Sequence, residues 1–75
     1  MMTWNYRVFK QMFHGESLFS IHETYYEDDK KVMAVTDSPS SPYGDTKKEI
    51  KRDLEMMLEA FNKPTLKWDA WEGKK

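Results

Sequence analysis

The chain has 75 residues and a formal net charge of −1, from 12 Lys or Arg and 13 Asp or Glu. This length accommodates one small domain, and the balanced charge argues against a dedicated nucleic-acid binder, which carries a basic excess. The absence of cysteine excludes disulfides and cysteine-rich zinc sites. Aromatic residues make up 15% of the chain, too many for a disordered protein.

Two features of the sequence bear on where the protein acts. Residues 1–7 show no basic start followed by a long apolar run, so no signal peptide is predicted. The longest uninterrupted apolar run, residues 32–35, is too short to cross a membrane. We therefore expect a soluble, cytoplasmic protein without membrane contact, and the lack of cysteine agrees with a reducing compartment.

The first half of the chain predicts strands. Apolar side chains alternate with period two in residues 4–12 and 18–26. Between them Gly15 can adopt the positive φ of a tight turn. A polar connection leads to a short third strand, residues 32–36, and the pattern leaves open which of its faces is buried, Val32/Ala34 or Met33/Val35. The helix-facing side chains of the first two strands are expected to be Trp4, Tyr6, Val8, Phe19, Ile21 and Tyr25.

One helix is predicted after an irregular loop, residues 37–44, that contains two Ser-Pro steps. Thr46 and Glu49 have the spacing of a capping box, in which each side chain accepts a hydrogen bond from the other residue's backbone amide. Asn62 is expected to end the helix in the left-handed conformation, just before Pro64. An apolar stripe is expected to cover the sheet along the helix: Ile50, Leu54, Met57, Leu58 and Phe61.

The order of these elements predicts an α+β fold. We expect a two-layer β-β-β-α(-β) domain with an antiparallel three- to four-stranded sheet and one helix packed on one face, where Leu66 and Trp68 add the last strand. The domain is expected to span residues 1–68. Residues 69–75 are expected to form a frayed tail, in which Trp71 is able to dock.

The sequence carries no motif for catalysis or for a cofactor. There is no Gly-x-Ser-x-Gly elbow, and the histidines His14 and His22 lack metal-binding spacing. The acidic run that starts at Glu27 is followed at once by two lysines and lacks the ligand ladder of a calcium loop. Ser20 and His22 share a strand face, which defines one enzyme hypothesis centred on His22. We expect no catalytic residue, no metal and no cofactor.

Two sets of side chains are candidates for partner binding. Lys47, Lys48, Lys51 and Arg52 occupy the first half of the helix, where the macrodipole disfavours cations; they form either a solvated face or a site for an acidic protein or nucleic-acid phosphates. Apolar residues predicted to lie outside the core suit a protein partner or a second subunit. The candidate contact residues are Phe9, Tyr26, Tyr43, Met56, Lys48 and Arg52.

Two resemblances add to these predictions. The segment Met-Thr-Trp-Asn-Tyr-Arg near the start and residues 21–26, 41–44 and 53–58 resemble a family of short bacterial proteins of unknown function. The step Gly44-Asp45-Thr46, after three strands, is similar to the helix-capping step of HicB-like antitoxins. That resemblance implies a partial ribonuclease-H-like module that dimerises and masks a toxin ribonuclease. Too few residues follow the helix for that family's C-terminal DNA-binding element.

The sequence therefore predicts a non-catalytic protein-interaction module. It is expected to be an antitoxin-like, accessory or inhibitory subunit that masks a partner's surface, with a protein partner or a homodimer, since small domains gain burial by association. One alternative is a nucleic-acid-binding protein that uses the basic half of the helix. A further alternative is a small enzyme centred on His22.

Overall fold

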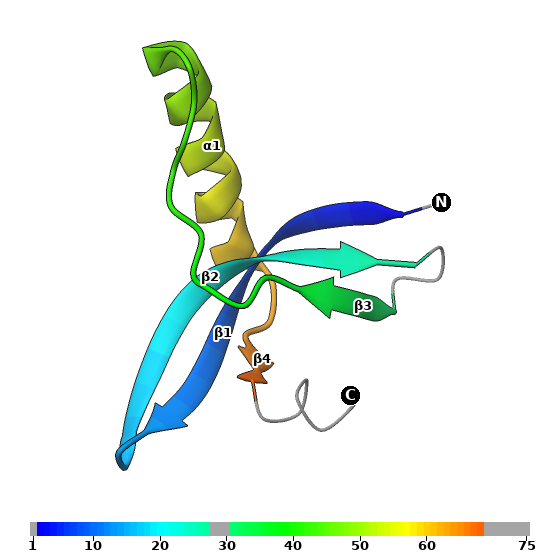
Figure 1. Ribbon diagram of the computed structural model, residues 1–75, viewed down its shortest axis with the longest axis vertical. Coiled ribbons are helices and arrows are strands. Elements are labelled where there is room, and N and C mark those ends of the chain that lie inside the picture. The colour runs from blue at the N-terminus through cyan, green and yellow to red at the C-terminus, as the bar shows by residue number, and fades with distance from the viewer. Residues whose placement is uncertain (1, 28–30, 69–75) are drawn as a thin grey trace.

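The computed structural model describes residues 2–27 and 31–68. Its elements confirm the expected α+β class and order (Figure 1). They are β1 (Thr3–Phe13), β2 (Glu16–Tyr26), β3 (Val32–Val35), α1 (Lys47–Glu59), the 3-10 turn η1 (Ala60–Asn62) and β4 (Leu66–Lys67). The expected frayed tail and the docking of Trp71 lie outside the described residues. No helix in the described ranges is long and apolar enough to cross a membrane.

A long hairpin forms the centre of the fold. β1 and β2 pair antiparallel from Thr3–Tyr26 to Phe13–Glu16. The two connecting residues both have positive φ, 52° at His14 and 81° at Gly15. Such a two-residue turn matches the right-handed twist of the strands. The sequence predicted the positive φ at Gly15 alone, so His14 is an additional left-handed residue.

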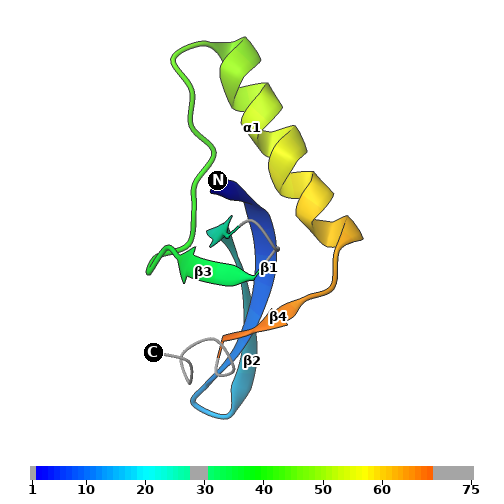
Figure 2. The same cartoon turned by 90° about the vertical axis from the view of Figure 1, so that its right-hand side faces the viewer.

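The sheet is mixed and curled, not purely antiparallel as expected. Its strand order is β3-β2-β1-β4. β3 pairs antiparallel with β2, whereas β4 pairs parallel with β1, with Phe9 opposite Leu66. The parallel pairing arises because the chain leaves the β3 edge, crosses through α1 and reaches the opposite edge running in the direction of β1 (Figure 2).

The start of α1 is capped by one half of the expected box. Thr46 Oγ1 accepts a hydrogen bond from the Glu49 amide at 3.1 Å. The Glu49 carboxylate, however, accepts from the Asp45 amide at 2.9 Å and not from that of Thr46. Gly44 passes so close to the helix that a Cβ there would lie 2.6 Å from the Ile50 nitrogen. Only glycine fits at this position.

The end of the helix also differs from the expectation. Among the described non-glycine residues only His14 has a positive φ, so Asn62 is not a left-handed cap. Instead α1 tightens into η1, and the Lys63 amide donates to the Ala60 carbonyl at 3.3 Å. Lys63 is extended and leads to Pro64 and β4.

The helix packs on β1 only through its C-terminal turns. The core on this side consists of Tyr6, Val8, Met57 and Ala60, with Ile21 partly buried. Figure 1 shows α1 rising away from the strands, so its first turns have no sheet beneath them. The predicted burial of the whole apolar stripe is therefore wrong: Met57 is buried and Ile50 half-buried, whereas Leu54, Leu58 and Phe61 are exposed.

A hydrogen bond accounts for the orientation of the helix. Asp53, Met57 and Ala60 follow one another at i, i+4 and i+7, so they share a face of α1 and η1. Tyr6 Oη donates to Asp53 Oδ1 at 2.6 Å, which turns this face towards β1. The expected stripe, centred between Leu54 and Leu58, is thereby rotated towards solvent.

The opposite face of the sheet is covered as well, contrary to expectation. Phe9 is 1% exposed and Tyr26 is 8% exposed, so neither lies on an open face. The ring centroid of Trp68, directly after β4, lies 5.5 Å from that of Phe9. After β3 the loop continues along β2, where the Ser40 amide donates to the Ile21 carbonyl. The curl of the sheet, β4 and this loop together enclose a second small core.

The short third strand follows neither of the two burial alternatives. Val32 and Val35 are half-buried, whereas Met33 and Ala34 are exposed. The register shift where β3 meets Tyr25 and Tyr26 interrupts the alternation of faces.

Candidate protein-binding surface

The described surface of the helix carries an apolar stripe without a partner. Leu54, Leu58 and Phe61 are exposed by 49%, 68% and 64%. Their spacing of i, i+4 and i+7 places them on one side of α1 and η1, and we call them the apolar helix face. The neighbouring stripe, which contains Met57, contacts the sheet. The helix thus has two adjacent apolar stripes, of which one is buried.

The apolar helix face continues onto the hairpin. Phe61 of η1 and Phe19 of β2 line the same hollow, which has a volume of about 400 Å³, and Phe19 is 59% exposed. The hollow is lined by Val8, Phe19, Ser20, Ile21, Phe61 and Thr65. Contiguous exposed apolar surface on a small protein marks an interaction site. The candidate surface therefore consists of the apolar helix face and Phe19.

The aromatic residues proposed from the sequence are not brought together. Phe9 and Tyr26 are buried, and the Tyr26 hydroxyl binds Arg7 Nη1 at 3.0 Å and Asn5 Oδ1 at 2.8 Å. Tyr43 and Met56 are exposed as expected, by 76% and 39%. Two helical residues two apart point to opposite sides, so Met56 lies away from the apolar helix face.

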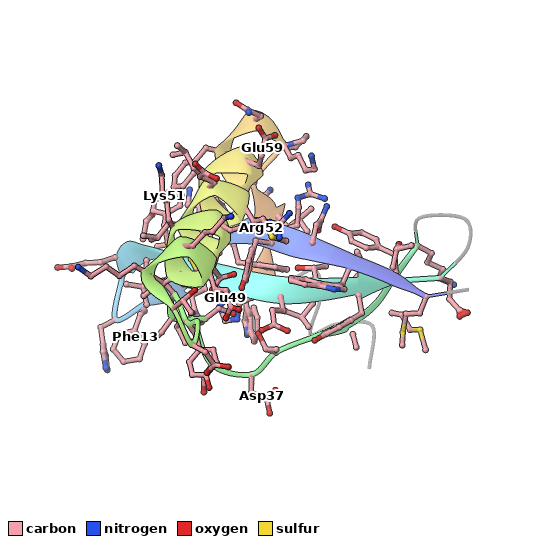
Figure 3. All side chains as sticks on the ribbon, turned by 90° about the horizontal axis from the view of Figure 1, so that it is seen from above. Phe13, Asp37, Glu49, Lys51, Arg52 and Glu59 are labelled. Carbon is pink, nitrogen blue, oxygen red and sulfur yellow. The ribbon has the colours of Figure 1, made fainter. Side chains whose placement is uncertain are left out.

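The charges of α1 are divided along its length. The four cations Lys47, Lys48, Lys51 and Arg52 lie in residues 47–53 together with two carboxylates, which gives +4 − 2 = +2. Residues 54–59 contain two carboxylates and no cation, which gives −2. Figure 3 shows Lys51 and Arg52 around the helix, with Glu59 towards its other end. With the part of the chain that the structure describes, none of the four cations forms an ion pair or a hydrogen bond.

The sequence suggested that Ser20 and His22 approach each other, and they do. Ser20 Oγ lies 2.8 Å from His22 Nε2, and His22 Nδ1 lies 2.9 Å from the Thr36 carbonyl oxygen. Because a carbonyl only accepts, we assign the hydrogen to Nδ1, and Nε2 then accepts from the Ser20 hydroxyl. His22 is 1% exposed and contacts the rings of Phe9 and Trp68. This geometry favours packing over catalysis, since a substrate has no access to the imidazole.

Asp53 on α1 forms hydrogen bonds with two other segments, β1 and the loop that precedes the helix. Its Oδ1 accepts from Tyr6 on β1, and its Oδ2 accepts from the Tyr43 amide in the loop at 2.9 Å. The pKa of Tyr6 is raised above its ordinary range, mainly by burial and then by the hydrogen bond to Asp53. A similar, partly buried pair explains Glu23, which interrupts the apolar face of β2. Glu23 accepts a hydrogen bond from the Tyr25 hydroxyl at 2.5 Å, and this bond raises the pKa of Tyr25.

Arg7 has a structural role on the other sheet face. Its Nη2 donates to the Pro64 carbonyl at 2.7 Å and its Nη1 to Tyr26, so it fastens β1 to the segment between η1 and β4. Its Nε is buried and has no hydrogen-bond partner. Because this atom is out of reach of solvent, the arginine is poorly placed to receive an anion.

Neither a metal-binding cluster in the described residues nor a similarity to known proteins indicates the function. Within residues 2–27 and 31–68, no three His, Asp or Glu side chains gather closely enough to hold a metal ion. No protein-family model matches the chain, and no curated protein or solved structure is significantly similar to it. Function is therefore inferred from the exposed surface and its chemistry.

Proposed function

We propose that this protein is a non-catalytic interaction module that covers the surface of a partner protein, as an antitoxin or an accessory or inhibitory subunit does. The observation that carries this proposal is the apolar helix face, on which Leu54, Leu58 and Phe61 lie side by side and are each about half exposed or more. The proposal places the protein in the cytoplasm, where a chain without cysteine is at no disadvantage.

The energetics of burial support this use of the helix. Covering one such apolar side chain contributes roughly 1.5–3 kcal/mol. Three adjacent side chains on a rigid helix form the kind of central apolar cluster that dominates the affinity of protein interfaces. A chain of 75 residues has only a small core of its own, so leaving this area open costs a sizeable part of its stability.

The test is partner capture by the purified protein, with two variants of matched exposure. Leu58→Asp places a charge in the apolar helix face, whereas Phe13→Asp places one at the hairpin turn, where the side chain is 60% exposed. We expect a stoichiometric partner of the wild type to be lost with Leu58→Asp and kept with Phe13→Asp. Equal capture by both variants contradicts the proposal.

The narrower form of the proposal is antitoxin-like masking of a ribonuclease. The resemblance of Gly44-Asp45-Thr46 to the capping step of HicB-like antitoxins supports it only at the level of the fold, because these residues form the start of the helix. A captured ribonuclease whose RNA cleavage stops at a one-to-one ratio of the two proteins supports this form. An unaffected cleavage rate excludes it.

Two alternatives have weaker support. Four exposed cations on α1 favour nucleic-acid binding, but the helix carries an equal number of carboxylates. That alternative requires RNA or DNA affinity that falls steeply with salt and that Lys48→Glu with Arg52→Glu abolishes. The enzyme alternative depends on His22, whose imidazole is enclosed.

A further inference from the structure

We infer that the partner of the apolar helix face is a second copy of this chain, with the two α1 helices packed antiparallel about a two-fold axis. This inference rests on the proposed function, because it names the partner of the same surface.

The division of charge along α1 carries the inference. The first half of the helix has a net charge of +2 and the second half −2. In an antiparallel pair, the basic half of each helix lies across from the acidic half of the other. A parallel pair places like charges together. The helix is therefore complementary to itself in one orientation only.

The same arrangement accounts for an unfavourable feature of the single helix. Cations near the N-terminus and anions near the C-terminus both oppose the macrodipole of their own helix. Here four cations lie in the first half, and the last turn contains no basic residue. These cations are without ion pairs in the described chain. A second helix running the opposite way supplies the missing opposite charges.

The apolar stripe fits a two-fold pairing equally well. With the axis crossing α1 between residues 55 and 56, Phe61 of one copy lies beside Ile50 of the other. Leu54 and Leu58 then lie near the axis, where both copies contribute them. Such a contact uses the same patch on both subunits, as a two-fold interface requires.

Sedimentation equilibrium of the full chain tests the inference. We expect the wild type to have twice the monomer mass and Leu58→Asp to be monomeric, with Phe13→Asp still dimeric. A wild type that is still monomeric at about 1 mM, so that its dimerisation free energy is weaker than ~4 kcal/mol, overturns the dimer. A monomeric wild type that still captures a different protein, and loses it with Leu58→Asp, leaves the proposed function standing although the dimer is overturned.

Charge reversal in two complementary variants tests the orientation. Lys47→Glu/Lys51→Glu makes both halves of α1 acidic, and Glu55→Lys/Glu59→Lys makes both basic. Each pair of changes favours its own helix through the macrodipole, so folding, checked by circular dichroism, is retained. We expect each variant alone to dimerise about tenfold more weakly, and an equimolar mixture to form the heterodimer. Unchanged dimerisation of both single variants overturns the antiparallel pairing.

Disulfide crosslinking gives an independent readout, because the chain has no cysteine of its own. In the antiparallel pair, Leu54→Cys lies close to the axis and is expected to crosslink to its counterpart. Lys47→Cys is expected not to crosslink, since at 1.5 Å per residue the two copies of position 47 lie about 25 Å apart. Efficient crosslinking through position 47 indicates a parallel pair and overturns the inference.

Discussion

Tyr6 donates its phenolic hydrogen to Asp53 across 2.6 Å, and this contact joins the first strand to the middle of the helix. Asp53 also accepts from the Tyr43 amide, so the same carboxylate holds the loop that leads into the helix. The contact selects which side of α1 faces the sheet. The side that it turns outward is the apolar helix face, on which the proposed function depends.

Tyr6→Phe is expected to lower the free energy of unfolding by about 1.5–3 kcal/mol, because a hydrogen bond to a partly buried charge is lost. Chemical denaturation monitored by circular dichroism measures the change. Tyr43→Phe is the matched control: its ring is 76% exposed, so its hydroxyl removal is expected to change stability by less than about 0.5 kcal/mol. Equal effects of the two substitutions contradict the role given to Tyr6.

The pH dependence of stability provides a second test of this contact. The pKa of Tyr6 in the folded chain lies above the value of about 10 for an unfolded tyrosine. The stabilisation of the fold by protonated Tyr6 is therefore complete below about pH 10. It is lost as the pH rises further, because Tyr6 in the unfolded chain releases its phenolic proton at a lower pH than Tyr6 in the folded chain. The stability difference between wild type and Tyr6→Phe is therefore expected to stay constant up to about pH 9 and to shrink as the pH rises above about 10. A constant difference contradicts the assignment.

Two adjacent helix residues are expected to respond in opposite ways. Met57 is 6% exposed and belongs to the core, whereas Leu58 is 68% exposed. Met57→Ala is expected to cost about 2–4 kcal/mol, since it leaves a cavity against β1. Leu58→Ala, measured in dilute solution where the chain is monomeric, is expected to cost less than about 1 kcal/mol. A larger loss of stability for Leu58→Ala than for Met57→Ala means that α1 packs on the sheet through the apolar helix face.

His22 is expected to be a stability residue. His22→Ala removes a buried ring packed against Phe9 and Trp68 and leaves the Thr36 carbonyl without its donor. The expected loss is on the order of 2–4 kcal/mol, measured by thermal or chemical denaturation. His14→Asn serves as the control, because asparagine tolerates the left-handed conformation of the exposed turn. A His22→Ala chain as stable as the wild type contradicts the second core.

Gly44 and Gly15 suit their positions for different reasons, which two substitutions distinguish. Any Cβ at Gly44 meets backbone atoms of the first helical turn at 2.6–2.8 Å, whereas Gly15 has open space and a φ of 81°. Gly44→Asn is therefore expected to destabilise by about 1–3 kcal/mol through overpacking. Gly15→Asn is expected to be tolerated, because asparagine enters the left-handed region. Hydrogen exchange of the first-turn amides of α1 distinguishes the two substitutions, since it is expected to become faster with Gly44→Asn and to stay unchanged with Gly15→Asn.

Local patterns in the sequence predicted the elements well. Period-two alternation located both long strands, and the Thr46 cap located the start of the helix. Ser20 and His22 were correctly placed on one face, because in a strand residues two apart point the same way. Lys48 and Arg52 were correctly expected to be exposed. Their division of charge from Glu55 and Glu59 is also visible in the sequence, although its meaning depends on the orientation of the helix.

The sequence by itself determined where strands and helix form, because dihedral preferences, capping and turn residues act over a few neighbouring positions. Only the tertiary structure decided which faces are covered. Phe9 is enclosed because β4 returns to the free edge of β1 in parallel. Leu58 is exposed because the Tyr6–Asp53 bond, between residues 47 positions apart, rotates the helix. Apolar periodicity shows that a side chain suits burial, but what covers it is set by contacts between distant segments.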